Sequence, residues 1–86
     1  MPMSLKIKFP LGMNTPDNVN TLQETIIPYF SHLGVDIFAY NFNHVNPDHM
    51  ICYRGPLNRK AEKFLEHLRD EGLQIEVNEY QPPSLD

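Results

Sequence analysis

Apolar and polar residues alternate in two short stretches of the chain. Residues 5–9 read LKIKF and residues 73–78 read LQIEVN. A period of two is typical of a strand that buries one face and exposes the other. Both stretches are therefore predicted to be strands of a half-buried sheet.

The middle of the chain favours a pair of strands. Residues 35–42, VDIFAYNF, are rich in β-branched and aromatic side chains, which favour strands. Asn46, Pro47 and Asp48 are typical turn residues. The chain from Val35 to Arg54 is therefore predicted to form an antiparallel hairpin closed by this loop.

Two further stretches repeat apolar residues every three or four positions, as helices with one buried face do. The first begins at Thr15-Pro16-Asp17, which supplies an N-cap, a favourable first helical residue and a negative charge at the positive helix end. It ends at Gly34 and is expected to bend at Pro28. The second ends at Gly72. The apolar positions are Val19, Leu22, Ile26, Tyr29, Phe30 and Leu33 in the first helix, and Leu57, Ala61, Phe64, Leu65 and Leu68 in the second.

The order strand, helix, strand, strand, helix, strand predicts an α+β fold of the ferredoxin-like type. Two right-handed β-α-β units would interleave in one antiparallel sheet of strand order 4-1-3-2, with both helices on one face. A chain of 86 residues is long enough for one core only. Residues 1–80 are therefore expected to form a single domain, followed by a flexible C-terminal tail at 81–86.

The face of the sheet without helices is predicted to be unusually aromatic. If Val35, Ile37 and Ala39 pack under the helices, then Phe38, Tyr40 and Phe42 point to the opposite side. Ile51 and Tyr53 would join them if Met50 and Cys52 are the inward residues of the third strand. The remaining outward residues would be Lys6, Lys8, Asp36, Gln74, Glu76, Asn78 and Tyr80.

Three interpretations of this aromatic face are open: a homodimer or partner interface, a platform on which bases stack, or rings that point inward because the register differs by one residue. RNA-binding domains of this topology are usually basic and use aromatic residues of the central strands. Here the net charge is −4 and the rings lie on an edge strand. We therefore favour a homodimer with Phe38, Tyr40 and Phe42 in or beside the contact, and do not expect a nucleic-acid partner.

Composition favours a folded globular protein. Hydrophobic residues make up 41% of it, which is too many for a disordered chain. Cys52 is the only cysteine, so no intrachain disulfide is possible, and a buried thiol is expected. The chain starts without an apolar signal region, and its apolar runs are too short for a membrane span. No membrane association is expected, and the cytoplasm is the default location.

The loop from the first strand to the first helix is the candidate ligand site. It contains Gly12, Met13, Asn14, Thr15 and Asp17, and its free amides would lie at the positive end of the helix. A carboxylate or another anionic group is the ligand that such a site favours. The alternative is that the segment only caps the helix.

A second candidate site is the hairpin loop, where His44, Asp48 and His49 gather next to Cys52. These residue types bind zinc or nickel, but their spacing matches no recognised metal site, and a solvated loop is the preferred interpretation. No nucleophile elbow, phosphate-binding glycine loop or matched carboxylate pair is visible. No catalytic residue, metal or cofactor is therefore assigned.

Two stretches resemble the ACT family of small regulatory domains, namely TLQETIIPYFSHLGVDIFAYNF at 21–42 and KAEKFLEHLRDEGLQIEV at 60–77. The resemblance implies the same topology, pairing of domains, and binding of an amino acid near the first strand-to-helix loop. Family members commonly have an Asp-x-Pro-Gly-like turn in that loop. This chain has Asn14-Thr15-Pro16-Asp17 instead, with Gly12 nearby.

These observations favour a non-enzymatic regulatory or binding module. It would dimerise and hold a small ligand, an amino acid among them, or a protein partner. The alternative is a small enzyme or metal-binding protein that uses the loop of His44, Asp48 and His49.

Overall fold

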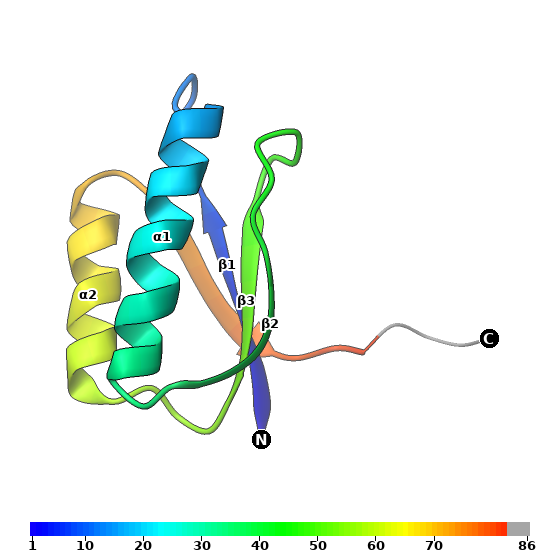
Figure 1. Ribbon diagram of the computed structural model, residues 1–86, viewed down its shortest axis with the longest axis vertical. Helices are drawn as coiled ribbons and strands as arrows, with labels where there is room; N and C mark the ends of the chain where they lie inside the picture. The colour runs from blue at the N-terminus through cyan, green and yellow to red at the C-terminus, as the bar shows by residue number, and fades with distance from the viewer. Residues whose placement is uncertain (83–86) are drawn as a thin grey trace.

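Leu5 and Ile7 are fully buried and Lys6 and Lys8 are exposed, as the alternation at 5–9 predicts. They belong to β1 (Pro2–Lys8), the first of six elements in the computed structural model, which describes residues 1–82. The other elements are α1 (Pro16–His32), β2 (Asp36–Asn41), β3 (His49–Arg54), α2 (Arg59–Asp70) and β4 (Gln74–Glu79). Both helices cover the same face of the sheet, so the protein has two layers (Figure 1).

The four strands form one antiparallel sheet in the order β2-β3-β1-β4. Read from the opposite edge, this is the predicted order 4-1-3-2. The predicted α+β architecture of a four-stranded antiparallel sheet with two helices is confirmed. Because β1 is central, both of its neighbours hold it in place, and β2 and β4 are the edge strands.

Polar side chains define where both helices begin. The hydroxyl of Thr15 accepts a hydrogen bond from the backbone N–H of Asn18, at 3.2 Å, so Thr15 is the N-cap of α1 as predicted. Asn58 caps α2 by accepting from the N–H of Ala61, at 2.9 Å. Its amide also donates to the carbonyl of Leu33, at 2.8 Å, which ties the start of α2 to the end of α1. α1 continues through Pro28 to His32 as one helix.

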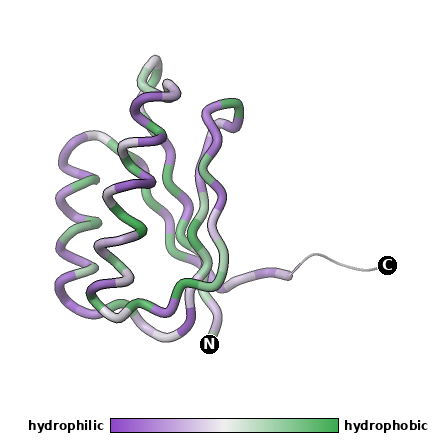
Figure 2. Tube along the Cα trace, in the orientation of Figure 1, coloured by the Kyte–Doolittle hydropathy of each residue, from purple (hydrophilic) through white to green (hydrophobic). Residues whose placement is uncertain are grey.

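The core lies between the two layers. Apolar residues recur along the inner sides of the helices and alternate along the strands (Figure 2). Burying each large apolar side chain contributes roughly 1.5 to 3 kcal/mol. The buried cluster consists of Leu5, Ile7, Leu22, Ile26, Phe30, Ile51, Tyr53, Ala61, Leu65, Leu68 and Ile75.

The predicted outward placement of Ile51 and Tyr53 is wrong. Ile51 lies opposite Leu5 on β1, and directly opposed residues of antiparallel strands point to the same face. Ile51 and Tyr53 therefore face the helices, and Met50 and Cys52 face away from them. Residues 50–53 form an unbroken apolar run, so the sequence contains no alternation to indicate the register. Cys52 is buried, as expected for its thiol, with 4% exposed.

The prediction that Phe38, Tyr40 and Phe42 share one face is also wrong, because β2 contains an irregularity. Ile37 lies opposite Tyr53 and Ala39 opposite Cys52, so two steps along β2 match one step along β3. Phe38 is the additional residue, as in a β-bulge. After it the alternation is reversed, and Tyr40 lies opposite Ile51 on the helix-covered face.

The flexible C-terminal tail at 81–86 stays a prediction. Gln81 and Pro82 have no regular secondary structure. Residues 83–86 of the predicted tail lie outside the described residues. Within the described part of the chain, neither helix combines the length and apolar character that a membrane span requires.

The double role of Asn58 generates a stability prediction. Replacing Thr15 with Ala removes one capping bond and should lower the free energy of unfolding by about 1 kcal/mol. Asn58→Ala removes a cap and the bond to Leu33, so we expect a loss of about 2 kcal/mol. Urea denaturation followed by circular dichroism measures both. Equal losses would show that the bond between the two helices contributes nothing.

Candidate functional site

The three aromatic residues of the predicted interface make different contacts. Phe42 stacks on the ring of His49, with ring centres 5.6 Å apart and planes 2° apart, and Tyr40 packs beside Phe42 at 6.2 Å. Only Phe38 lies on the open face, the side of the sheet without helices. The predicted aromatic stripe is therefore absent. Dimerisation itself stays a prediction.

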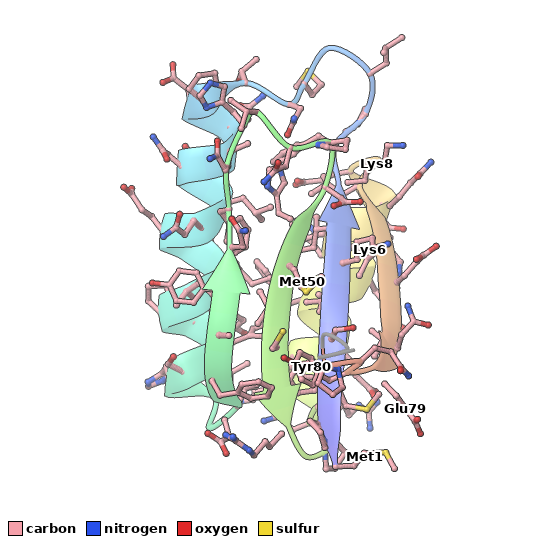
Figure 3. All side chains as sticks on the ribbon, turned by 90° about the vertical axis from the view of Figure 1, so that its right-hand side faces the viewer. Met1, Lys6, Lys8, Met50, Glu79 and Tyr80 are labelled. Atoms are coloured by element: carbon pink, nitrogen blue, oxygen red, sulfur yellow. The ribbon has the colours of Figure 1, made fainter. Side chains whose placement is uncertain are left out.

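Phe38 already has partners from its own chain. The guanidinium of Arg54 lies 4.3 Å from the centre of its ring, and the ring of Tyr80 meets it edge-on at 5.4 Å. Tyr80 also donates its backbone N–H to the carbonyl of Pro2, and it lies over the central strands of the open face (Figure 3). Lys6 and Lys8 lie on other parts of this face, beside the apolar Met50 (Figure 3). Glu76 and Gln74 lie opposite the two lysines on β4, so this part of the face is mostly polar.

The candidate ligand loop is tied to the hairpin loop by Asn14. The amide nitrogen of Asn14 donates to the carbonyls of His44 and Asn46, at 3.1 and 2.8 Å. Its amide oxygen lies 2.7 Å from Nε2 of His49. These three contacts join two loops that are about 30 residues apart in the chain.

The rest of the candidate ligand loop is internally bonded as well. Thr15 caps α1, and the carbonyl of Met13 accepts from the backbone N–H of Thr15 and the side chain of Asn18. Gly12 has a φ of +82°, which favours glycine at this turn. Asp17 is exposed in the first turn of α1. The loop thus has a structural role, and ligand binding by Gly12, Met13, Asn14, Thr15 and Asp17 stays a prediction.

His49 is the buried centre of this group, with only 1% of its surface exposed. Its Nδ1 accepts the backbone N–H of Asn43 at 3.3 Å, so Nε2 carries the proton and donates to Asn14. Phe9 meets the ring edge-on and Phe42 stacks on it. Burial lowers the pKa of His49, against an opposing contribution from the charge of Asp48. His49 is therefore held in its neutral form.

The same contacts weigh against the alternative metal site. Both ring nitrogens of His49 already have protein partners, so neither is free to coordinate a metal beside His44 and Asp48. Over residues 1–82, no three His, Cys, Asp or Glu side chains are placed to hold a metal ion together.

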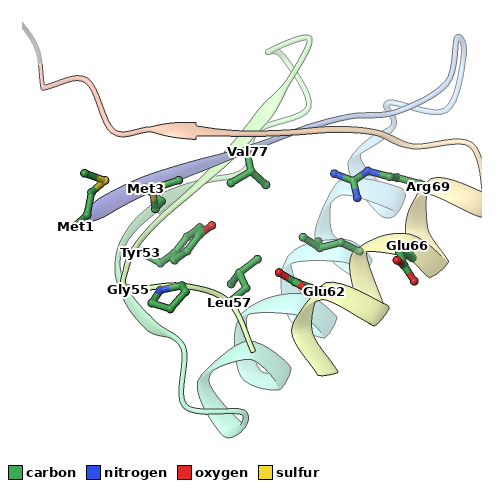
Figure 4. Close-up of a pocket in the computed structure, with 11 residues that line it drawn as sticks. Met1, Met3, Tyr53, Gly55, Leu57, Glu62, Glu66, Arg69 and Val77 are labelled. Carbon is green, nitrogen blue, oxygen red and sulfur yellow. The ribbon is translucent and has the colours of Figure 1, made fainter. Parts of the chain in front are cut away.

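A cavity of about 650 Å³ lies between α2 and the sheet, at the end where β1 begins (Figure 4). Apolar surface comes from Met1, which precedes β1, and from Met3, Leu57, Leu65 and Val77. Val77 is 39% exposed at the rim because it lies on an edge strand. The remaining lining residues are Tyr53, Gly55, Pro56, Glu62, Glu66 and Arg69.

Tyr53 is the polar group at the centre of this cavity. Its side chain is 2% exposed and packs in the core, while its hydroxyl points into the cavity (Figure 4). The hydroxyl forms no hydrogen bond with any residue from 1 to 82. No fully buried side-chain oxygen in this range lacks a partner, so the hydroxyl must reach solvent through the cavity. Burial, with a contribution from the charge of Glu62, raises the pKa of Tyr53.

Three charged side chains of α2 form one wall of the cavity. Glu62, Glu66 and Arg69 each follow a buried residue of the helix, so they lie along one flank of its apolar side. Arg69 also donates to the backbone carbonyl of Ile75 on β4, at 3.1 Å. The wall therefore combines two carboxylates with a guanidinium that is already bonded to the sheet.

The sequence did not indicate this cavity. Glu62, Glu66 and Arg69 have the spacing of an ordinary solvated helix face. Tyr53 was placed on the wrong face of the sheet. One sequence signal could have indicated it. A charged residue directly follows each of the buried positions Ala61, Leu65 and Leu68, which places these charges beside the apolar face of the helix.

Comparisons with protein-family models, with curated proteins and with solved structures found no match to this chain.

The buried neutral His49 generates a prediction about pH. The unfolded chain binds a proton at His49 below about pH 6.5, whereas the folded protein resists it until a lower pH. The free energy of unfolding should therefore fall as pH drops from 7.5 to 5. Protonation would also place a donor at Nδ1, against the N–H of Asn43.

Urea denaturation at several pH values, compared between the wild type and His49→Gln, measures this contribution. The variant should be less stable at pH 7.5 and should lose less of its stability on acidification. The same pH slope in both proteins would show that another group is responsible.

Proposed function

We propose that this protein is a small non-enzymatic binding module with a ferredoxin-like fold, which holds a small ligand in the cavity between α2 and the sheet. The observation that carries the proposal is the hydroxyl of Tyr53, which points into that cavity without a partner among residues 1–82. The strand-helix order and the strand order support the ferredoxin-like assignment.

The size and lining of the cavity fit a small molecule. Ligand sites in proteins are typically about 300 to 1,000 Å³, mostly apolar, with a few placed polar groups. Here the volume is about 650 Å³. Apolar side chains from two strands and α2 surround one hydroxyl and three charged groups. Such a site orients a ligand by its polar atoms and retains it by its apolar surface.

The resemblance to ACT domains supports a regulatory role for such a module. The cavity, however, lies at the end of the sheet where β1 begins, whereas the loop of Gly12 and Asn14 follows the end of β1. In that loop the polar groups of Asn14 and Thr15 are paired with protein atoms. We therefore propose the cavity, and not the loop, as the ligand site.

A thermal-shift screen tests the proposal directly. A compound that binds only the folded state raises the melting temperature. The screen should include amino acids, nucleotides, and short aliphatic alcohols, amines and acids. At least one class should stabilise the protein, and its binding should perturb the NMR signals of Tyr53, Leu57 and Val77.

Two tryptophan variants on β4 locate the site. Val77→Trp fills the cavity from its rim and should weaken binding about tenfold or more, a loss of about 1.4 kcal/mol. Gln74→Trp is the control, because Gln74 lies opposite Lys8 on the open face. It should leave the affinity nearly unchanged. If no compound binds, or if both variants weaken binding alike, the cavity is not the ligand site.

A further inference from the structure

We infer that the cavity selects a primary amine with an aliphatic chain, whose ammonium group is held between the hydroxyl of Tyr53 and the carboxylate of Glu62. This inference rests on the proposed function and names the chemical class of its ligand.

The Tyr53 hydroxyl is available to form hydrogen bonds with a ligand. A tyrosine hydroxyl can both donate and accept a hydrogen bond, and in this protein it does neither with a described residue. The ring around it is almost completely buried. A ligand atom in the cavity is therefore the natural partner. The raised pKa keeps the group a neutral hydroxyl, which can accept a bond from an ammonium.

The wall of the cavity that α2 forms carries two negative charges, from Glu62 and Glu66. Glu62 and Glu66 are four residues apart on α2, so they are neighbours on its surface, and like charges at this spacing repel. Arg69 lies on the same wall, and its guanidinium donates to the backbone carbonyl of Ile75. Met1 lies at the other end of the cavity, away from Glu66 and Arg69 (Figure 4). A ligand cation beside Glu62 would relieve the repulsion.

Much of the remaining surface of the cavity is apolar. Met3, Leu57, Leu65 and Val77 leave an apolar volume next to the polar groups. An ammonium bound at Glu62 would extend its aliphatic chain into this volume. An anionic group in the same place would lie beside the carboxylate of Glu62, which repels it, even though the Tyr53 hydroxyl could donate to it. The cavity is therefore suited to an amine and not to a fatty acid.

A matched series of hexyl compounds tests the selectivity. Hexylamine, 1-hexanol and hexanoate share one chain and differ in the head group. They are titrated at pH 7.5 into the ¹⁵N-labelled full chain, and the signals of Tyr53, Leu57 and Val77 report binding. We expect hexylamine to bind about tenfold more tightly than 1-hexanol, and hexanoate to bind most weakly.

Three variants assign the selectivity to its residues. Glu62→Gln should weaken hexylamine about tenfold and leave 1-hexanol unchanged. Glu76→Gln removes the same charge from the open face, opposite Lys6, and should change neither affinity appreciably. Tyr53→Phe should reduce the preference for the amine, and urea denaturation checks that this variant remains folded. If Tyr53→Phe unfolds, the affinities of Glu62→Gln for hexylamine and 1-hexanol decide whether the inference holds.

The outcomes separate the inference from the proposed function. If 1-hexanol and hexylamine bind in the cavity with equal affinity, the amine inference is wrong and the binding function stands. If Glu62→Gln and Glu76→Gln weaken hexylamine equally, the attraction is a general charge effect and the inference is also wrong. If none of the three compounds perturbs the cavity signals while the thermal-shift screen identifies another ligand there, only the inference fails. If the screen is also negative, both fail.

Discussion

The register of β1 between its two neighbours is the constraint on which the rest of the structure depends. Leu5 lies opposite Ile51 on β3 and opposite Val77 on β4. Because opposed residues share a face, this one alignment directs Leu5, Ile7 and their neighbours toward the helices. A shift of one residue would turn Lys6 and Lys8 into the core and expose Leu5 and Ile7. The burial of two fully enclosed side chains therefore fixes the sheet, and with it the direction of Tyr53.

The helices depend on that alignment in turn. α2 presents Ala61, Leu65 and Leu68 to the sheet, and Asn58 holds its start against the end of α1. Where α2 passes the start of β1, Met3 and Val77 are the facing residues, and they do not fill the space in front of Tyr53. The cavity is thus a consequence of how two well-defined layers meet at one end.

The sequence was sufficient for the elements and their order, but not for two local features. Caps such as Thr15 and stops such as Gly34 are local signals, and the helix periodicity is strong in both helices. The bulge at Phe38 depends on pairing with β3, which the residues of β2 do not encode alone. Residues 50–53 of β3 are all apolar, so their sequence does not indicate which of them face the helices. Only the pairing with β1 determines this. Both errors moved aromatic rings to the wrong face, and they concealed the cavity while suggesting an interface.

β3 carries a buried polar side chain near each of its ends, and their different states indicate where a ligand belongs. His49 and Tyr53 both face the helices, and both are at least 98% buried. At His49, every polar atom has a partner in the protein, so the cost of burying it is offset internally. At Tyr53, the hydroxyl opens into a cavity lined by carboxylates and has no partner among residues 1–82. A buried polar group gains most from a ligand where the protein has left it without a partner. The ligand site is therefore expected at the Tyr53 end of β3, and the structural contact between the two loops lies at the His49 end.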